Sequence, residues 1–403
     1  MKKAVLILTR CPYPVNGGRE SILSQTIDFF EGKYDLTIFY FSKNKLDKDE
    51  FDKRNLISTP LNFPSKVELI YNIIFRRHLT LQENLFFSVS NSKLINKAIQ
   101  EIRPDLVYVD MIRMSQYIEE HAVYKVIDID DLLSIRYKRF IEQKESSVFG
   151  TFSTVVPSFI KKVVERIFKN MILKYESLKM EDREIEIVGK YDRCFLVSEK
   201  EKNLLIKKTN SHNIHTNTQA IRSRENLYSK HINCNNLIFI GNMLTAQNKS
   251  SLKMIVDEIL PKFRFRYKLF VVGKYDNTTL ELTCRNNNIE LLGFVDDLKE
   301  TLRSIKLALM PISFGTGIKT KVLDCMSYGI PVITNNVGCE GLNAKDNENI
   351  FILKNNEITH DSMLRILENN DLLQSIGRNG HQYIKDYHDF DMLKEDFLGN
   401  IEC

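Results

Sequence analysis

A glycine-rich turn with two lysines is the part of this 403-residue sequence best suited to chemistry. The turn, Gly315-Thr316-Gly317, follows an apolar run that ends at Pro311, and a helical pattern begins near Lys321. Glycines let backbone N–H groups approach an anion closely, and the start of a helix favours negative charge. Lys319 and Lys321 add positive charge to the same stretch. We interpret it as a site for a phosphate-bearing ligand.

Asp324 follows Lys321 by about one helical turn, so the two side chains are predicted on the same helix face. A carboxylate at this position can accept hydrogen bonds from sugar hydroxyls. Phosphates at the helix start and a sugar one turn later would suit a nucleotide. Glycine-rich turns before helices are common, so a solvated helix face with a surface acid is the alternative.

The elements that must position these residues alternate between strands and helices. Continuous apolar runs of this kind are typical of parallel strands buried on both faces. A helix is predicted over 21–30, directly after the first strand and its glycine loop. The pattern predicts an α/β fold with two doubly wound series. Strands are predicted at 3–9, 34–41, 104–110, 124–131, 193–198, 237–241, 267–273, 289–293, 307–311, 331–334 and 349–353.

Four parts are predicted along the chain. Residues 1–220 form an N-terminal Rossmann-like domain, with a helical insert at about 132–190, and a polar linker covers 221–235. Residues 236–378 form a C-terminal Rossmann-like domain, and residues 379–403 form a last helix. Ligands of open α/β sheets lie at the carboxyl ends of strands, so two facing sheets would form a cleft between the domains.

The stretch from Gly315 to Asp324, followed by Met326-Ser-Tyr-Gly329-Ile-Pro331, resembles a known family. It is similar to glycosyltransferase family 4 enzymes of the GT-B fold, in the subgroup used in bacterial surface-polysaccharide assembly. The family carries two glutamates separated by seven residues. Asp324 takes the second place, where the family holds the donor ribose, and Thr316, which cannot act as an acid, takes the first. The resemblance also implies that the last helix returns to the N-terminal domain.

Further donor-side positions follow from the resemblance. The family contacts the donor diphosphate from a strand and loop like the one at Gly241, where Asn242 replaces the usual arginine and Lys249 is the nearest candidate for the lysine. The turn Gly293-Phe294-Val295 resembles the one whose backbone meets the nucleotide base. The donor-binding candidates are therefore Gly17, Gly18, Gly241, Asn242, Lys249, Phe294, Val295, Gly315, Thr316, Gly317, Ile318, Lys319, Lys321 and Asp324.

Candidates in the first domain come from the same resemblance. Gly17 and Gly18 resemble the loop that reaches the donor phosphates, and Asp110 ends a strand where many members place a histidine near the reacting sugar. The catalytic candidates are Asp110, Lys321 and Asp324, and the acceptor-side candidates are Arg19, Asp128 and Asp130. The alternatives are a plain turn at the glycines, a solvated strand end at Asp110, and helix capping by the later aspartates.

Charge and composition exclude other classes. The net charge of +5 is too mild for a dedicated nucleic-acid binder, and no apolar stretch is long enough to span a membrane. The segment from Leu132 to Lys174, however, contains nine Lys and Arg but only three Glu, so its net charge is +6. Apolar residues interleave these charges. The favoured interpretation of this segment, 132–174, is a solvated helix that packs its apolar face on the N-terminal domain, and contact with an anionic membrane surface or a lipid-linked acceptor is the alternative. No secretory signal is recognised and the seven cysteines form no CxxC pair, so a cytoplasmic location is expected. A peripheral position on the inner face of the cell membrane is compatible with it.

The sequence therefore predicts a retaining glycosyltransferase that moves a sugar from a nucleotide sugar to a glycan or lipid-linked acceptor. No cofactor and no metal are expected, since the eight histidines show no metal-ligand spacing. The alternatives are a catalytically inactive partner subunit, a nucleotide-sugar epimerase of the same architecture, and a nicotinamide-dependent enzyme. The last is disfavoured because the first loop lacks the GxGxxG pattern.

Overall fold

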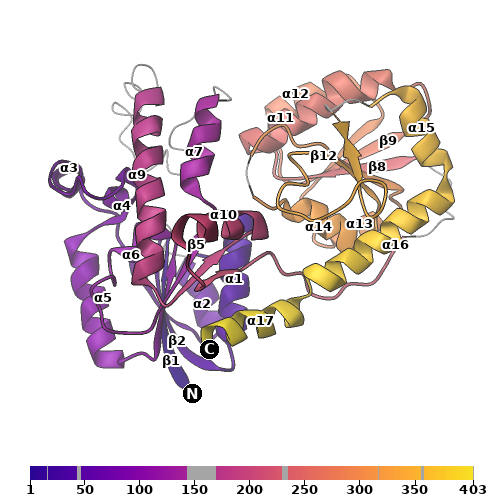
Figure 1. The fold of residues 1–403 in the computed structure, drawn as a ribbon. Helices are drawn as coiled ribbons and strands as arrows, with labels where there is room; N and C mark the ends of the chain where they lie inside the picture. Colours follow the sequence, from indigo (N-terminus) through magenta and orange to yellow (C-terminus); the bar gives the residue numbers. More distant parts are fainter. Residues whose placement is uncertain are drawn as a thin grey trace. The chain divides into compact units, whose positions relative to one another are not determined.

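The structure is a computed structural model that describes residues 1–15, 17–42, 47–142, 169–228, 235–315, 317–354 and 358–402. The chain divides into two compact units, shown in Figure 1. The first comprises Met1–Thr218 and Lys394–Cys403, and the second comprises Gln219–Leu393. The second unit thus contains the predicted linker, and the end of the last helix belongs to the first unit.

The first unit is built on a parallel sheet of seven strands, in the order β3-β2-β1-β4-β5-β6-β7. Its central strands are the predicted apolar runs, and Ala4 to Leu8 of β1 are almost completely buried. Burial on both faces is what a continuous apolar run predicts for a parallel strand. The strands are β1 (Lys2–Leu8), β2 (Tyr34–Phe41), β3 (Ile57–Leu61), β4 (Leu106–Asp110), β5 (Lys125–Asp130), β6 (Arg193–Leu196) and β7 (Ile214–Thr216).

Some helices of the first unit begin at polar caps. Ser65 with Glu68, and Thr80 with Glu83, form reciprocal capping boxes that satisfy free N–H groups at the starts of two helices. The helices are α1 (Gly18–Phe30), α2 (Asp47–Lys53), α3 (Lys66–Phe75), α4 (Leu81–Phe86), α5 (Val89–Ile102), α6 (Ile112–Ser115), α7 (Leu133–Glu142), α9 (Lys169–Lys190) and α10 (Glu199–Thr209).

The described part of the predicted insert is a pair of helices, α7 and α9, which pack against each other (Figure 1). Glu184 of α9 accepts hydrogen bonds from the backbone N and the hydroxyl of Ser134 at the start of α7, at 2.9 and 2.6 Å. Arg183 is buried and forms ion pairs with Glu83 and Glu119. The Glu184 contacts join the two helices, and the ion pairs of Arg183 attach α9 to the body of the unit. The rest of the basic segment, residues 143–168, lies outside the described residues.

The second unit repeats the architecture with a parallel six-stranded sheet, in the order β10-β9-β8-β11-β12-β13. The strands are β8 (Asn236–Ile240), β9 (Lys268–Val272), β10 (Ile289–Gly293), β11 (Leu307–Met310), β12 (Val332–Asn335) and β13 (Phe351–Leu353). The helices are α11 (Ala246–Met254), the short turns Ile255–Ile259 and Leu260–Lys262, α12 (Asn277–Thr283), α13 (Leu298–Leu302), α14 (Thr320–Ser327), α15 (His360–Glu368), α16 (Asn370–Tyr387) and α17 (Phe390–Glu402), which ends in the first unit.

Both sheets reverse their winding direction at a corresponding place. In the first, the chain winds outward from β1 in one direction and from β4 in the other, and in the second the same holds for β8 and β11. The predicted pair of doubly wound α/β domains is therefore confirmed. Ligands of such sheets bind at the carboxyl ends of the strands, where the winding reverses. In the second unit this place lies between the loops after β8 and β11.

Candidate functional site

Two neighbouring side chains of α11 connect the loops at the reversal point of the second sheet. Gln247 donates to the carbonyl of Phe314 in the loop after β11, at 2.6 Å. Asn248 donates to the carbonyl of Asn242 in the loop after β8, at 3.0 Å. The glycines make these contacts possible, since a Cβ at Gly241 would lie 2.7 Å from the Asn248 side chain and one at Gly315 would lie 2.4 Å from Gln247.

Lys321 lies in the first turn of α14, and its side chain extends toward Asn248 of α11 and toward β8. Its Nζ lies 2.5 Å from Oδ1 of Asn248 and 4.9 Å from the centre of the Phe239 ring at the end of β8. Burial, with a smaller contribution from Lys319, lowers the pKa of Lys321 to about 7. The ammonium group therefore lies where charge is unfavourable without an anion, which is suitable for a group that binds one.

The turn before α14 takes the conformation that its glycines predict. Gly315 has φ +119° and Gly317 has φ +74°, values that favour glycine. A Cβ at Gly317 would meet no atom within 4 Å, so φ and not space requires the glycine. Lys319 is buried and its Nζ donates to the carbonyl of Gly317, while Ile318 packs on the core. Thr316 lies outside the described residues.

Asp324 lies on α14 one turn after Lys321 and is partly buried. Its Oδ1 lies 3.0 Å from Nη1 of Arg224, a residue of the chain segment that enters the second unit. Burial raises the pKa of Asp324, and the Arg224 guanidinium acts against that rise. The sequence interpretation did not include Arg224, because nothing in the spacing of the two residues connects them.

The loops after β9 and β10 add an apolar surface at the same end of the sheet. Phe294 is 70% exposed beyond Gly293, whose φ is +72°, and Val295 packs on the core. Tyr275 is also exposed, and its ring lies 3.7 Å from where a Cβ of Gly293 would be. An exposed ring beside a glycine turn can stack on a planar ligand.

Two of the predicted donor-binding residues, Lys249 and Asn242, already interact with other groups of the protein. Lys249 forms an ion pair with Asp276, the residue that caps α12, and this contact holds the pKa of Asp276 well below its usual range. The amide oxygen of Asn242 accepts from the backbone N of Leu244 at 3.0 Å. Lys249 would have to exchange Asp276 for a ligand before it could bind a phosphate.

In the first unit, Asp110 is fully buried at the end of β4. Its Oδ2 accepts from the backbone N of Thr9 at 2.8 Å and from the Thr9 hydroxyl, and its Oδ1 accepts from Nε of Arg19 at 2.9 Å. Burial favours a higher pKa for Asp110, but Arg19 and Thr9 outweigh it and the pKa lies below the usual value. Both oxygens are thus occupied, and a catalytic role for Asp110 stays a prediction.

The guanidinium of Arg19 also lies close to the two predicted acceptor-side aspartates, Asp128 and Asp130. Its Nη1 lies 3.4 Å from Oδ1 of Asp128 and 3.2 Å from Oδ1 of Asp130. Asp128 also accepts from Tyr108 and Asn217, each at 2.9 Å, and burial raises its pKa despite Arg19. Asp130 is the more exposed of the two and has φ +72°, an uncommon value for a residue with a side chain.

The two N-terminal glycines lie at the start of α1, which is also the reversal point of the first sheet. Gly17 is the N-cap residue, with an extended backbone, and a Cβ there would lie 2.7 Å from Glu20. A Cβ at Gly18 would meet nothing within 4 Å. Gly18 is the first residue of α1, and Arg19 follows it. Because there is space for a side chain at Gly18, packing does not require a glycine at this position.

The structure therefore brings the candidates together as two groups, one in each unit. Lys319, Lys321 and Asp324 lie on or beside α14, with Gly241 and Gly315 at the loops next to it. Arg19, Asp110, Asp128 and Asp130 form one cluster of charges. Within the described ranges, no group of three or more His, Cys, Asp or Glu side chains has the arrangement of a metal site. Sequence reasoning missed Thr9, Arg224, Gln247 and Asn248, whose roles depend on tertiary contacts.

Comparison with known proteins points to one class of enzyme. Residues 234–369 match the family model described as "Glycosyl transferases group 1". A curated relative from Klebsiella pneumoniae, described as an uncharacterized 44.6 kDa protein in the cps region, is 21% identical over 406 residues, covering 96% of this chain and 97% of its own. The family match covers α14 and the loops after β8 and β11, but not Arg224.

Solved structures show the same fold over the whole chain. A variant of S. aureus TarM, in complex with fondaparinux, α-GlcNAc-glycerol and UDP, is 12% identical with a TM-score of 0.67 and covers 100% of both chains. Anabaena Alr3699/HepE in complex with UDP-glucose is 12% identical with a TM-score of 0.64 and covers 99% of both chains. At these identities the likeness establishes the GT-B fold.

Proposed function

We propose that this chain, a glycosyltransferase of the GT-B fold whose residues 234–369 match the group 1 glycosyl transferase model, uses a nucleotide sugar as donor. The acceptor would be a glycan or a lipid-linked sugar in the assembly of a capsule, O-antigen or exopolysaccharide. The cps-region relative and the UDP complexes of the structural neighbours support this choice. The observation that carries it is the position of Lys321 between the loops after β8 and β11.

We assign the donor diphosphate to the start of α14. The backbone N–H groups of the turn, Lys319 and Lys321 would stabilise the charge that develops on the departing diphosphate. Asp324, one turn later, would accept hydrogen bonds from the ribose, and Phe294 would lie against the base. Lys249 is a further phosphate ligand if it exchanges Asp276 for the donor. No metal and no cofactor are part of this proposal.

The chemistry proposed for this site needs no strong base. The acceptor hydroxyl can pass its proton to the leaving phosphate itself, which agrees with the retention of configuration that the family resemblance implies. We assign the acceptor to the first unit, near Gly18 and Asp130. Gly18 is exposed next to Arg19, and Asp130 is the most exposed of the three aspartates around Arg19. Asp110 and Asp128 would then hold Arg19 in place, since both are fully buried.

A surface of the first unit supports a peripheral position on an anionic membrane. In α3 the apolar residues at helical spacing face outward, while Leu69 and Asn72 are buried. This reverses the usual arrangement of a surface helix, in which the apolar stripe faces the core. Six large apolar side chains of this helix are between 40% and 79% exposed, namely Val67, Ile70, Tyr71, Ile73, Ile74 and Phe75. Such a face is suited to insertion at the boundary of a lipid bilayer.

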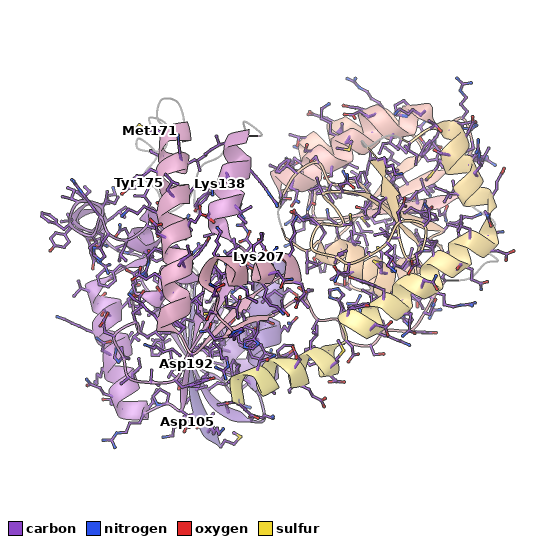
Figure 2. All side chains as sticks on the ribbon, in the orientation of Figure 1. Asp105, Lys138, Met171, Tyr175, Asp192 and Lys207 are labelled. Carbon is purple, nitrogen blue, oxygen red and sulfur yellow. The ribbon has the colours of Figure 1, made fainter. Side chains whose placement is uncertain are left out.

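The charges around α3 favour anionic lipid as the occupant of this face. Lys66 begins the helix and Arg77 follows it, and both are exposed. Glu68, the acid of the helix, uses its oxygens on the N–H groups of Ser65 and Val89. On α9, Met171 and Tyr175 are exposed and are labelled in Figure 2. Lys174, the last residue of the predicted basic segment, is also exposed. Among the described helices, none has the length and hydropathy to cross a membrane.

Calorimetric titration with nucleoside diphosphates tests the site assignment. We expect Lys321→Met and Asp324→Ala each to weaken binding at least tenfold, because each removes a proposed ligand of the nucleotide. Lys253→Met, on the exposed side of α11, is the matched control because its charge is paired with Asp257 at the surface. If both site variants bind and turn over as the parent does, the assignment is wrong.

A further inference from the structure

We propose that Arg224 is a positioning residue that holds the Asp324 carboxylate ready for the ribose of the donor. The inference rests on the proposed function and adds a residue that neither the motif nor the family match identifies, since Arg224 precedes the matched range 234–369. It comes from a different part of the chain, 100 residues before Asp324.

The first step of the argument is how firmly Arg224 is held. Its Nη1 donates to Oδ1 of Asp324 at 3.0 Å and to Oγ of Ser327 at 3.3 Å. Its guanidinium carbon lies 4.6 Å from the centre of the Tyr328 ring. A planar guanidinium that is stacked and hydrogen-bonded at the same time has little freedom to turn.

The backbone around Arg224 is attached to the same end of α14. The N–H of Leu227 donates to the carbonyl of Tyr328 at 2.9 Å. A Cβ at Gly329 would lie 2.3 Å from the amide oxygen of Asn226, so the chain approaches this turn as closely as a glycine permits. The segment 224–227 therefore follows the end of α14, and the position of Arg224 is fixed relative to Asp324.

The second step is what this contact leaves free. Arg224 engages Oδ1 of Asp324, while Oδ2 has no hydrogen-bond partner among the residues that the structure describes. Asp324 is also about 29% exposed, so a ligand can reach it. Arg224 thus holds one oxygen of the carboxylate and leaves the other free. The free oxygen can accept a hydrogen bond from a ribose hydroxyl without first breaking a contact within the protein.

The third step concerns charge. Burial raises the pKa of Asp324, and Arg224 is the cation that opposes this rise. An ionised carboxylate accepts hydrogen bonds more strongly than a neutral acid. Without Arg224, Asp324 would bind a proton at higher pH and would lose this capacity under mildly acidic conditions. The role of Arg224 thus has a pH signature that a purely structural residue would not show.

The experiment measures ribose-dependent binding. ADP, GDP and UDP are titrated into the full chain, and the tightest ligand is compared with its 2′,3′-dideoxy analogue and with inorganic pyrophosphate. The variants are Arg224→Met, Arg224→Lys, Asp324→Asn and the double variant Arg224→Met/Asp324→Asn. Arg222→Met is the matched control, since Arg222 lies on the same segment and stacks on Phe390 instead. Far-UV circular dichroism establishes that each variant is folded.

We expect Arg224→Met to weaken the nucleotide about tenfold at pH 6 and less at pH 8, with little effect on the dideoxy analogue or pyrophosphate. Arg224→Lys should weaken nucleotide binding less than Arg224→Met does. The double variant Arg224→Met/Asp324→Asn should bind the nucleotide as weakly as Asp324→Asn alone. An equal loss for all three ligands, or no loss, overturns the inference. If the parent chain binds none of the nucleotides, the proposed function fails as well, and this outcome is distinct from a parent that binds while Arg224→Met changes nothing.

Discussion

The Nζ of Lys321 lies 2.5 Å from Oδ1 of Asn248, and this contact joins the helix after β11 to the helix after β8. The ammonium group is thus held at the point where the second sheet reverses its winding. The amide oxygen of Asn248 is an uncharged acceptor. The hydrogen bond therefore orients the Lys321 side chain but does not neutralise its positive charge. A bound diphosphate would provide the missing negative charge.

Nucleotide binding should therefore take up a proton near neutral pH. Burial lowers the pKa of Lys321 to about 7, so a large part of the free protein carries the neutral amine above that value. An anionic ligand favours the ammonium form and raises the pKa, so affinity should fall as pH rises from about 7 to 9. Calorimetry in two buffers of different ionisation enthalpy measures the uptake directly.

Lys321→Met is the control for that experiment, because it removes the titrating group while the ligand still titrates. Binding by this variant should be weaker and should show only the proton exchange of the nucleotide itself. Equal proton uptake by the parent and Lys321→Met would contradict the placement of Lys321 at the diphosphate.

Phe294→Ala should weaken a nucleoside diphosphate and leave pyrophosphate unchanged, because the exposed ring is assigned to the base. A lost stacking contact corresponds to about 0.5–1.5 kcal/mol, or roughly two- to tenfold in affinity. Competition binding with the two ligands measures the difference. Leu280→Ala, an exposed apolar residue of α12, is the control, and a parallel loss for both ligands would exclude the stacking role.

Ile70→Glu/Ile74→Glu should reduce flotation of the full chain with vesicles that contain phosphatidylglycerol by at least tenfold. Both side chains are exposed on α3, so the substitutions add charge to the face that is proposed to enter the bilayer without disturbing the buried Leu69. Binding by the parent should also weaken at high salt and with neutral phosphatidylcholine vesicles.

Leu280→Glu, on the second unit, is the matched control for the vesicle experiment. Unchanged flotation of the α3 variant would contradict the membrane surface. A change from dimer to monomer in the same variant would instead assign the face to a second copy of the chain.

Arg19→Met should destabilise the first unit by about 3–5 kcal/mol, because it leaves the buried Asp110 and Asp128 without their cation. Amide hydrogen exchange of β1 and β4 reports the stability of this unit separately. Lys33→Met, which breaks an exposed pair with Glu402, should change stability by about 1 kcal/mol or less. Equal effects of the two substitutions would show that the cluster contributes no more than a surface pair.

Glu184→Gln should make the packing of α9 less dependent on pH. Burial raises the pKa of Glu184 to about 7, above the unfolded value near 4.5, so its favourable contribution is complete below about pH 4.5 and is lost as pH rises through 7. The parent should therefore lose protection of α9 amides between about pH 4.5 and 7 more steeply than the variant. Hydrogen exchange at several pH values measures this, and identical slopes would show that Glu184 does not titrate in that range.

The core strands were predictable because their apolar runs are continuous. All the predicted strands are present within a few residues, from β1 to β13. Two strands were missed, β3 and β7. The edge strand β3 contains Pro60 and is mostly outside the core, and β7 has three residues. Short edge strands lack the hydrophobic run on which the prediction depends.

The donor side of the site was easier to predict than its supporting contacts. Lys319, Lys321 and Asp324 lie on one local motif, so spacing alone places them together. Arg224 and Asn248 reach the same helix from 100 and 73 residues away in the chain, which no local pattern encodes. The cluster of Arg19 with three aspartates is similar, since its acids come from the ends of two different strands.

The most direct test of the central claim is a donor screen that measures release of free nucleoside diphosphate. The full chain is incubated with common nucleotide sugars and a bacterial lipid extract as acceptor, and Lys321→Met is run in parallel. We predict that one donor releases diphosphate in an acceptor-dependent way, and that Lys321→Met reduces the rate at least a hundredfold. Release that needs no acceptor, or an equal rate in Lys321→Met, would contradict glycosyl transfer at this site.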